Sequence, residues 1–222
     1  MTKKSYKQEI YTNKEDWLNA RGIGGSSAGA ILGVSKWETA NDVYSSIVFN
    51  RNKSFDNERM KEGRDAEDLI RKLFIIEHPN LKVIEPPVNN QYRLFRRDDE
   101  PLLTLTPDGL IDDDGGLEIK DVELRKKEDI EKWLSGVIPP YYYSQLIQYF
   151  IVKTDLKYMI LLARLKIYQK GELDHIETRE YRLDRKGAKK EIEKQEKKLI
   201  DFIRNNIEQK IRPSLKIEMK GN

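Results

Sequence analysis

Two acidic residues and a lysine lie close together around one predicted turn, and their types are those that phosphodiester chemistry uses. Asp108 follows the apolar run Leu102–Thr106, while Glu118 and Lys120 lie in a second apolar run, Leu117–Val122. Three Asp and two Gly residues immediately precede the second run, and this turn composition predicts a β-hairpin. Because side chains alternate along a strand, Glu118 and Lys120 should share one face, with Asp108 across from Glu118.

Such a group suits metal-dependent hydrolysis. Mg²⁺ prefers oxygen ligands, which the carboxylates of Asp108 and Glu118 and the Ile119 carbonyl could supply. A bound metal makes water a nucleophile near neutral pH, and Lys120 could orient or deprotonate that water and offset charge on the scissile phosphate. A plain hairpin with exposed acids and a surface lysine would show the same residues.

Glu67 is a further candidate ligand, on the clearest predicted helix, Glu62–Glu77. Apolar residues recur there at helical spacing: Ala66, Leu69, Ile70, Leu73 and Phe74. Glu67 falls at the edge of that apolar face. A carboxylate held against a core usually has a partner or a metal, although an ion pair with Arg71 one turn away would also serve.

Arg21 precedes a segment of glycine and serine that runs into an apolar stretch and should open a helix. Backbone N–H groups at a helix N-terminus, with the hydroxyls of Ser26 and Ser27 and a nearby arginine, suit an anion. The segment matches neither a Walker motif nor a dinucleotide-binding motif. A flexible turn with a serine cap is the plainer interpretation.

The elements that must position these residues alternate between helices and strands, as in a single α/β domain. We predict helices at Lys14–Asn19, from Ala28, from Thr39, and at Glu62–Glu77, Tyr141–Lys153 and Arg185–Ile211. We predict strands at Lys82–Glu85, Tyr92–Arg96, Leu102–Thr106, Leu117–Val122, Tyr158–Leu165 and Glu177–Leu183. No repeat or linker suggests a second domain, so we expect a single domain over residues 1–222, with its core at about 15–183 and a charged helix at about 185–211.

Composition limits the possible functions. The 222 residues carry 41 basic and 38 acidic side chains, a net charge of +3, so a nucleic-acid surface would have to be a local basic patch. The absence of cysteine excludes disulfides, a thiol nucleophile and cysteine-ligated zinc or iron–sulfur sites. No apolar run is long enough for a bilayer and the N-terminus lacks a signal-peptide pattern, so we expect a cytoplasmic protein without a membrane partner.

Six short motifs, in this order, resemble the lambda-exonuclease and YqaJ-type viral recombinase family of PD-(D/E)xK nucleases. They are Trp17-x-x-x-Arg21, Gly24-Gly25-Ser26, Gly63-x-x-x-Glu67, Thr106-Pro107-Asp108-Gly109, Leu117-Glu118-Ile119-Lys120 and Tyr142-Tyr143-Ser144-Gln145. The resemblance implies a restriction-endonuclease-like α/β core, with a mixed central β-sheet flanked by helices.

The resemblance also implies an activity. It is Mg²⁺-dependent 5′→3′ digestion of one strand of linear double-stranded DNA, with Mn²⁺ able to substitute for Mg²⁺. The 3′ single-stranded tails left behind would serve phage-type recombination with a single-strand annealing protein, in the cytoplasm of a bacterial host. A homo-oligomer, most simply a trimeric ring around the duplex, is expected from the family.

By resemblance, each site residue has a role. Metal binding falls to Glu67, Asp108 and Glu118, Lys120 serves the water, and Gln145 lies in the active site. The 5′-terminal phosphate falls to Arg21, Ser26 and Thr106, with Ser27 competing with Ser26 because the Gly-Ser segment is short. Two departures from the family pattern are Gln148, one residue later than the usual second glutamine, and Asp121, an extra acid beside the site.

Two other functions stay open. One is another PD-(D/E)xK nuclease, either an endonuclease or a Cas4-like processing enzyme, although an iron–sulfur Cas4 would need cysteines. The other is a non-catalytic module that binds DNA ends.

Overall fold

The computed structural model of the protein describes residues 4–50 and 58–214, without the side chains of residues 58–62 and 64. Its helices are α1 (Lys14–Ala20), α2 (Gly25–Ile31), α3 (Ala40–Val48), α4 (Glu58–Glu77), α5 (Lys127–Leu134), α6 (Pro140–Val152) and α7 (Lys189–Phe202), with a π-helical turn η1 (Ile203–Ile207) after α7. Its strands are β1 (Tyr6–Tyr11), β2 (Val83–Ile84), β3 (Tyr92–Arg97), β4 (Thr104–Leu105), β5 (Gly109–Ile111), β6 (Gly115–Leu124), β7 (Tyr158–Gln169) and β8 (Glu172–Asp184).

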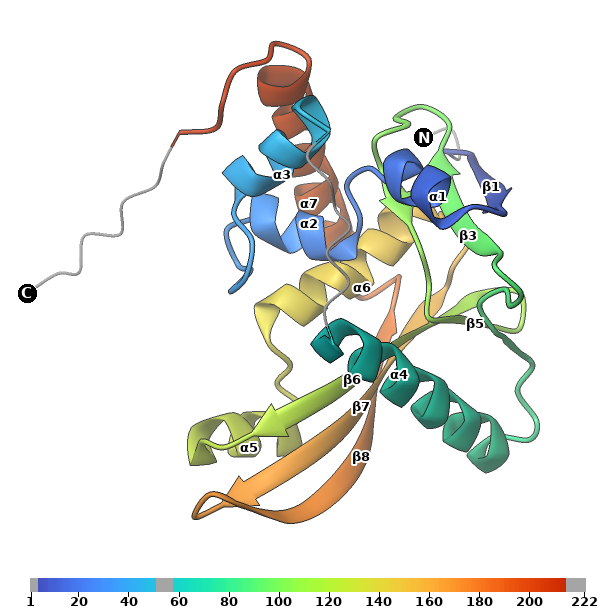
Figure 1. The fold of residues 1–222 in the computed structure, drawn as a ribbon, viewed down its shortest axis with the longest axis vertical. Helices are drawn as coiled ribbons and strands as arrows, with labels where there is room; N and C mark the ends of the chain where they lie inside the picture. Colours follow the sequence, from blue (N-terminus) through green and yellow to red (C-terminus); the bar gives the residue numbers. More distant parts are fainter. Residues whose placement is uncertain (1–3, 51–57, 215–222) are drawn as a thin grey trace, which may run out of the picture.

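Within the described residues the strands form two sheets. The larger has the order β2-β5-β6-β7-β8 and is mixed, because β6 and β7 run parallel while the other pairs are antiparallel. The smaller is antiparallel, with the order β1-β3-β4. In Figure 1, α2, α3, α6 and α7 gather at one end of the molecule and α4 lies in front of the larger sheet. The predicted fold class, a mixed central sheet flanked by helices, is confirmed.

The two faces of β6 are buried against different helices. Leu117 and Ile119 pack with Ile70 and Phe74 of α4 in one apolar cluster. The opposite face of β6 meets α6, whose Tyr149 reaches the side chain at position 118. Because side chains alternate along a strand, the catalytic candidates on β6 are turned away from α4 and toward α6.

Helix α6 is buried along most of its length. Pro140 occupies its first turn, where a backbone N–H is not needed, and every residue from Ser144 to Val152 is buried. A helix that is apolar all round belongs in a core. Its burial fixes Gln145 and Tyr149, one turn apart, over the larger sheet.

The predicted hairpin is real, but its first strand was misplaced. The strand that pairs with β6 is Gly109–Ile111, after Asp108 rather than before it. The run predicted at Leu102–Thr106 contributes only β4, which pairs with β3 in the other sheet. Asp108 therefore lies at the crossover between the two sheets.

Other boundaries also differ from expectation. Strand β1 forms at Tyr6–Tyr11, where the sequence predicted no strand, because it completes the smaller sheet beside β3. The charged C-terminal helix begins at Lys189 rather than at Arg185 and turns into a π-helix after Phe202. Arg185 is held outside the helix, since its side chain donates to the carbonyls of Leu156 (2.6 Å) and Phe150 (2.5 Å).

The apolar face of α4 is only partly covered. Ile70 and Phe74 are buried as predicted, but Leu69 is 51% exposed and Leu73 is 48% exposed, and Ile76 beyond them is 73% exposed. These three residues are spaced four and three apart and so follow one side of the helix. The apolar stripe predicted from the sequence is therefore two surfaces, one packed on the sheet and one left open in this chain.

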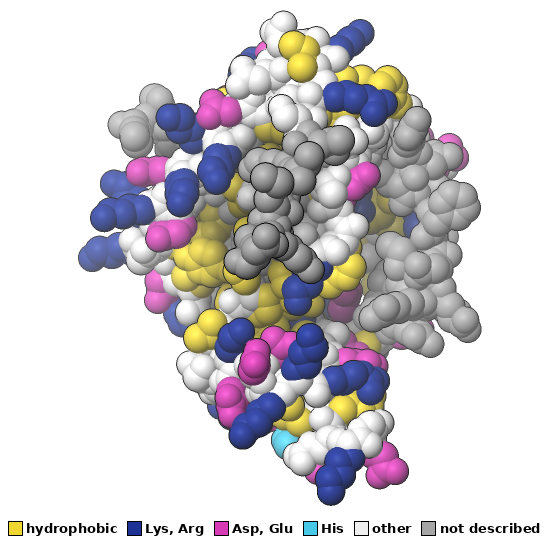
Figure 2. Space-filling model, turned by 90° about the vertical axis from the view of Figure 1, so that its left-hand side faces the viewer, with side chains coloured by type: hydrophobic (Ala, Val, Ile, Leu, Met, Phe, Trp, Pro, Cys, Tyr) yellow, Lys and Arg dark blue, Asp and Glu magenta, His cyan; other side chains and the backbone are white. Residues whose placement is uncertain are grey.

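One side of the molecule carries hydrophobic side chains among charged side chains of both signs. Figure 2 shows hydrophobic side chains at mid-height on this face, with Lys, Arg, Asp and Glu side chains around them. None of the described helices is both long and apolar enough to pass through a bilayer.

Candidate active site

A cleft of about 690 Å³ opens where the two sheets meet. It is lined from several elements at once: α1, the glycine loop before α2, α4, β3, residues 104–108, β6 and α6. Of the predicted site residues, those that line it are Arg21, Ser26, Glu67, Thr106, Asp108, Glu118, Lys120 and Gln145. Elements distant in sequence thus bring nearly all of the candidates to one cavity.

The acidic pair and the lysine form one hydrogen-bonded group. Lys120 Nζ lies 2.5 Å from Glu118 Oε1. Asp108 Oδ2 accepts from the backbone N–H of Ile119 at 2.8 Å, which joins the two strands through the site. The predicted sharing of a face by Glu118 and Lys120 and the placement of Asp108 opposite Glu118 both agree with this geometry.

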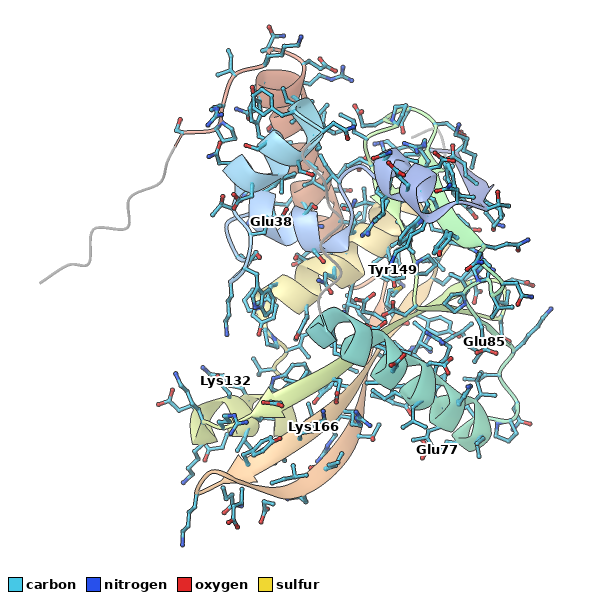
Figure 3. The ribbon with its side chains drawn as sticks, viewed as in Figure 1. Glu38, Glu77, Glu85, Lys132, Tyr149 and Lys166 are labelled. Carbon is cyan, nitrogen blue, oxygen red and sulfur yellow. The ribbon has the colours of Figure 1, made fainter. Side chains whose placement is uncertain are left out.

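Tyr149 completes the group and was not singled out from the sequence. Its hydroxyl donates to Glu118 Oε2 at 2.5 Å and accepts from the backbone N–H of Asp108 at 3.2 Å. In Figure 3 it lies between α6 and the larger sheet. The signal that could have revealed it is its position four residues after Gln145, on the same side of a helix.

Negative charge is in excess at this point. Burial raises the pKa of the Asp108 carboxyl well above its ordinary value, and Glu118 and Glu67 add to the effect. Burial alone would lower the pKa of Lys120, but the carboxylates of Glu118 and Asp108 more than reverse this, so its pKa is raised and the ammonium is retained. Burial and the same two carboxylates raise the pKa of Tyr149. The group therefore favours additional positive charge.

The donor set fits a divalent cation. Asp108 and Glu118 offer carboxylate oxygens whose repulsion a cation would relieve, and the hardness of these ligands suits Mg²⁺. Glu67 lines the same cleft but comes from α4, which packs on the opposite face of β6. Among the described residues, no three acidic or histidine side chains converge closely enough to make a complete metal site. Water or substrate oxygens would have to complete the coordination.

Arg71 ties α4 to the site and was expected only as a partner of Glu67. Its Nε donates to the backbone carbonyl of Asp108 at 2.8 Å, and its Nη1 contacts Asp68 at 3.2 Å. The residue is buried. It therefore fixes the backbone of Asp108 relative to the helix that carries Glu67.

The candidate phosphate residues Arg21, Ser26 and Thr106 line the same cleft. Arg21 lies 4.9 Å from the ring of Trp17, which stacks on Tyr92 at 5.0 Å. Ser26 Oγ accepts from Gln145 Nε2 at 3.3 Å, which links Ser26 to α6. Among the described residues that line the cleft, Ser26 is present and Ser27 is not.

The two departures from the family pattern lie outside the reacting group. Gln148 is fully buried and donates to the Ile23 carbonyl at 2.9 Å, so it anchors the glycine loop. Asp121 is paired with Arg164 at 2.8 Å and with Lys166 at 2.7 Å on β7. Its charge is thus already compensated on the neighbouring strand.

Comparison with known proteins decides the family. Residues 16–157 match the model of the YqaJ-like viral recombinase domain. The chain belongs to the YqaJ-like viral recombinase family. No curated protein matches it.

Solved structures share the fold of this YqaJ-like chain. The alkaline exonuclease LHK-Exo from Laribacter hongkongensis superposes with a TM-score of 0.66 at 20% identity, over 89% of this chain and 94% of that one. The crystal structure of LHK-Exo in complex with dAMP gives a TM-score of 0.62 at 21% identity, over 90% and 97% of the two chains. At this identity the likeness establishes a PD-(D/E)xK-type fold. The cleft residues from Arg21 to Gln145 all fall inside the YqaJ-like region, whereas β8 and α7 lie beyond it.

Proposed function

We propose that this chain is a metal-dependent exonuclease that digests the 5′-ended strand of linear double-stranded DNA. The observation that carries the proposal is the contact of Lys120 with Glu118 at 2.5 Å, beside Asp108, in a cleft between two sheets. Membership in a viral recombinase family and a fold shared with an alkaline exonuclease support it.

Mg²⁺ is the proposed cofactor, and Mn²⁺ should replace it. Asp108, Glu118 and the Ile119 carbonyl would hold the cation, with Glu67 contributing from α4. Such a cation assists the attack of water on phosphorus as a Lewis acid. Lys120 keeps its proton at neutral pH, so it would hold the water and offset phosphate charge rather than act as a base. Tyr149 orients Glu118, and Gln145 positions Ser26.

The 5′→3′ polarity of digestion is proposed from the candidate phosphate residues of the cleft. Arg21, Ser26 and Thr106, with Ser27 as the alternative to Ser26, would hold a 5′-terminal phosphate and so set the next bond at the metal. A planar guanidinium suits that role because it donates two parallel hydrogen bonds to phosphate oxygens. Repeated cycles would leave 3′ single-stranded tails for an annealing protein.

The surface offers a route for DNA. Trp37 is 71% exposed and packs edge-on against Tyr141, and Lys36 lies 5.1 Å from the Tyr141 ring. Exposed aromatic rings beside a cation bind unpaired bases by stacking. This arrangement supports nucleic acid as the partner. We further propose that the chain is a single nuclease domain that acts in the bacterial cytoplasm.

A supercoiled plasmid tests the function against its alternatives. We expect Mg²⁺-dependent release of nucleotides from the linearised plasmid and no cut in the supercoiled form. An endonuclease would cut both forms, and an end-binding module neither. Glu118→Gln and Lys120→Ala should abolish digestion of the linear form while the folded protein still binds DNA. Normal turnover by Lys120→Ala would contradict the assigned site.

A further inference from the structure

Arg93 is a charged side chain in the cleft that makes no hydrogen bond or ion pair with the part of the chain that the structure describes. Its Nε and Nη1 atoms are shielded from solvent, and neither has a hydrogen-bond partner among the described residues. The residue lines the same cleft as Arg21 and Thr106. Nothing in the function proposed above assigns it a role.

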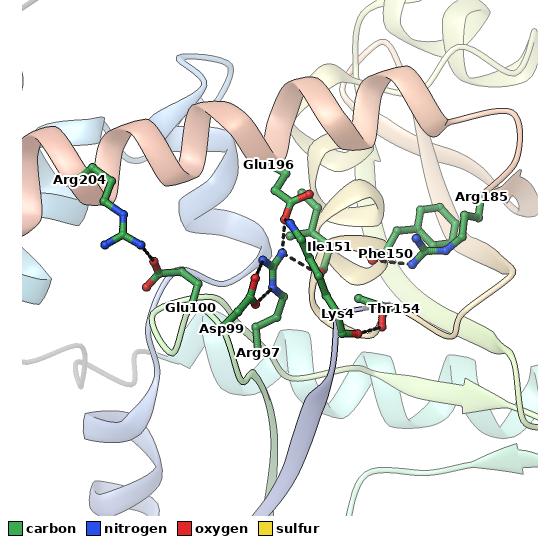
Figure 4. Close-up of polar contacts among 10 residues, drawn as sticks. All are labelled: Lys4, Arg97, Asp99, Glu100, Phe150, Ile151, Thr154, Arg185, Glu196 and Arg204. Carbon is green, nitrogen blue, oxygen red and sulfur yellow. Dashed lines mark hydrogen bonds and ion pairs between the residues drawn. The ribbon is translucent and has the colours of Figure 1, made fainter. Parts of the chain in front are cut away.

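Arg97, four residues later on β3, is a buried guanidinium whose hydrogen bonds are all made within the protein. It is 1% exposed and binds both carboxylate oxygens of Asp99 at 2.6 Å. It also contacts Glu196 of α7 (Figure 4). Arg96, between the two, is likewise held, by Glu9 at 3.2 Å and by the Ala20 carbonyl at 2.7 Å. Arg93 differs from both in that its Nε and Nη1 find no acceptor within residues 4–50 and 58–214.

The absence of an acceptor has an energetic consequence. Burial lowers the pKa of Arg93, and no carboxylate among the described side chains offsets that effect. A guanidinium nevertheless stays charged at neutral pH. Holding a partly desolvated charge without a counter-charge is unfavourable, so the arrangement suits a site in which a ligand brings the negative charge.

The second unsatisfied group nearby is the hydroxyl of Thr106. Its Oγ1 is buried and has no hydrogen-bond partner among the described residues. Thr106 lines the same cleft as Arg93. Two polar side chains with buried atoms that lack hydrogen-bond partners among the described residues thus line one cavity.

We propose that Arg93 is the second guanidinium of the phosphate pocket, where it binds the 5′-terminal phosphate together with Thr106 and Arg21. The inference rests on the proposed function for the identity of the ligand as a DNA end. The presence of two unsatisfied polar groups in the cleft does not depend on it. A terminal phosphate carries more charge than an internal one, which matches two guanidinium groups better than one.

The test compares binding of two short duplexes that differ only in a 5′-phosphate or a 5′-hydroxyl end, with EDTA present so that no cleavage occurs. Wild type should prefer the phosphorylated end. Arg93→Gln should reduce that preference about ten- to 150-fold, the factor of a charge-assisted hydrogen bond, and Arg93→Lys should retain part of it. Arg182→Gln, an exposed arginine of β8, is the control and should keep the full preference.

Thermal melting separates this role from a structural one. Arg93→Gln should melt no lower than wild type, because no internal hydrogen bond is lost, whereas Arg97→Gln should melt well below it. A large fall in the melting temperature of Arg93→Gln would overturn the inference. An equal loss of affinity for the phosphorylated and the hydroxyl duplex would also overturn it, because Arg93 would then bind an internal phosphate. Unchanged affinity of Arg93→Gln for both duplexes would overturn it as well.

The exonuclease proposal fails separately. If wild type prefers the phosphorylated end but never digests linear duplex with Mg²⁺, the proposed function is wrong and Arg93 still binds the phosphate. If wild type binds both ends equally, the phosphate pocket and the role of Arg93 are both rejected.

Discussion

At the scale of single residues, the chemistry of the site follows from carboxylates held close together in a cleft. The ammonium of Lys120 binds Glu118, the Ile119 N–H binds Asp108, and the Tyr149 hydroxyl holds the second oxygen of Glu118. The pKa of Asp108 is raised, first by burial and then by Glu118. The geometry that would bind a cation therefore costs stability in the protein without one.

This cost predicts an effect of pH on the metal-free protein. The folded state binds a proton at Asp108 more tightly than the unfolded chain does. Its contribution to stability therefore falls as pH rises from the ordinary value of about 4 through the raised pKa. At pH 7 in EDTA, Asp108→Asn should melt above wild type by about 2–4 °C or more, the shift that ~1 kcal/mol gives at this chain length.

Asp121→Asn is the matched control, with the opposite sign. Burial would raise the pKa of Asp121, but Arg164 and Lys166 outweigh it, so the pKa is lowered. The Asn variant should therefore melt below wild type at pH 7. Mg²⁺ should raise the melting temperature of wild type and not that of Asp108→Asn. A destabilised, metal-responsive Asp108→Asn would show that this carboxylate is neither strained nor a ligand.

At the scale of elements, alternation along a strand was enough to predict the central group. It correctly placed Glu118 and Lys120 together and Leu117 and Ile119 in the core. The alternation did not reveal β5, because the sequence Pro107-Asp108-Gly109 has the composition of a turn. Strand β5 forms through its pairing with β6.

Contacts between segments that are distant in the sequence could not be predicted either, because periodicity describes only local structure. Helical periodicity shows that Leu69 and Ile70 lie near one face of α4, but not which of them the sheet covers. Helical spacing sets Tyr149 beside Gln145, but not against Glu118 and Asp108, and the sequence around Arg93 does not show which arginine of β3 lacks an internal acceptor. Both roles depend on residues that are distant in the sequence.

The glycine loop makes a prediction at this scale. A Cβ atom on Gly22 would lie 2.1 Å from the Leu102 carbonyl oxygen. Any side chain at this position would therefore clash with the backbone just before β4. Gly22→Ala should lower the free energy of unfolding by about 1–3 kcal/mol and displace Arg21. The measurement is denaturant unfolding, with Gly24→Ala as control, because its nearest neighbour would lie 4.0 Å away. Equal stability of the two variants would contradict this role.

At the scale of the whole molecule, the open side of α4 supports self-association. Leu69, Leu73 and Ile76 expose an apolar stripe along that helix. Cyclic symmetry closes head-to-tail contacts into a ring, and a trimer is the proposed form. By light scattering, wild type should have three times the mass of the chain and Leu73→Glu the mass of one.

Val137→Glu is the control for that experiment, since Val137 is exposed between α5 and α6 rather than on the stripe. It should keep the oligomer. A monomeric wild type at working concentration would contradict the ring. Loss of the oligomer in Val137→Glu but not in Leu73→Glu would move the interface away from α4.

Polarity of digestion is the most direct measurement of the site as an exonuclease centre. A linear duplex carries distinct labels at its 5′ and 3′ ends, with one 5′ end phosphorylated and the other blocked. With Mg²⁺ we expect early release of the 5′ label as a mononucleotide, a long single strand that keeps the 3′ label, and no release by Glu118→Gln. Earlier release of the 3′ label, or release by Glu118→Gln, would contradict a 5′→3′ exonuclease built on Asp108, Glu118 and Lys120.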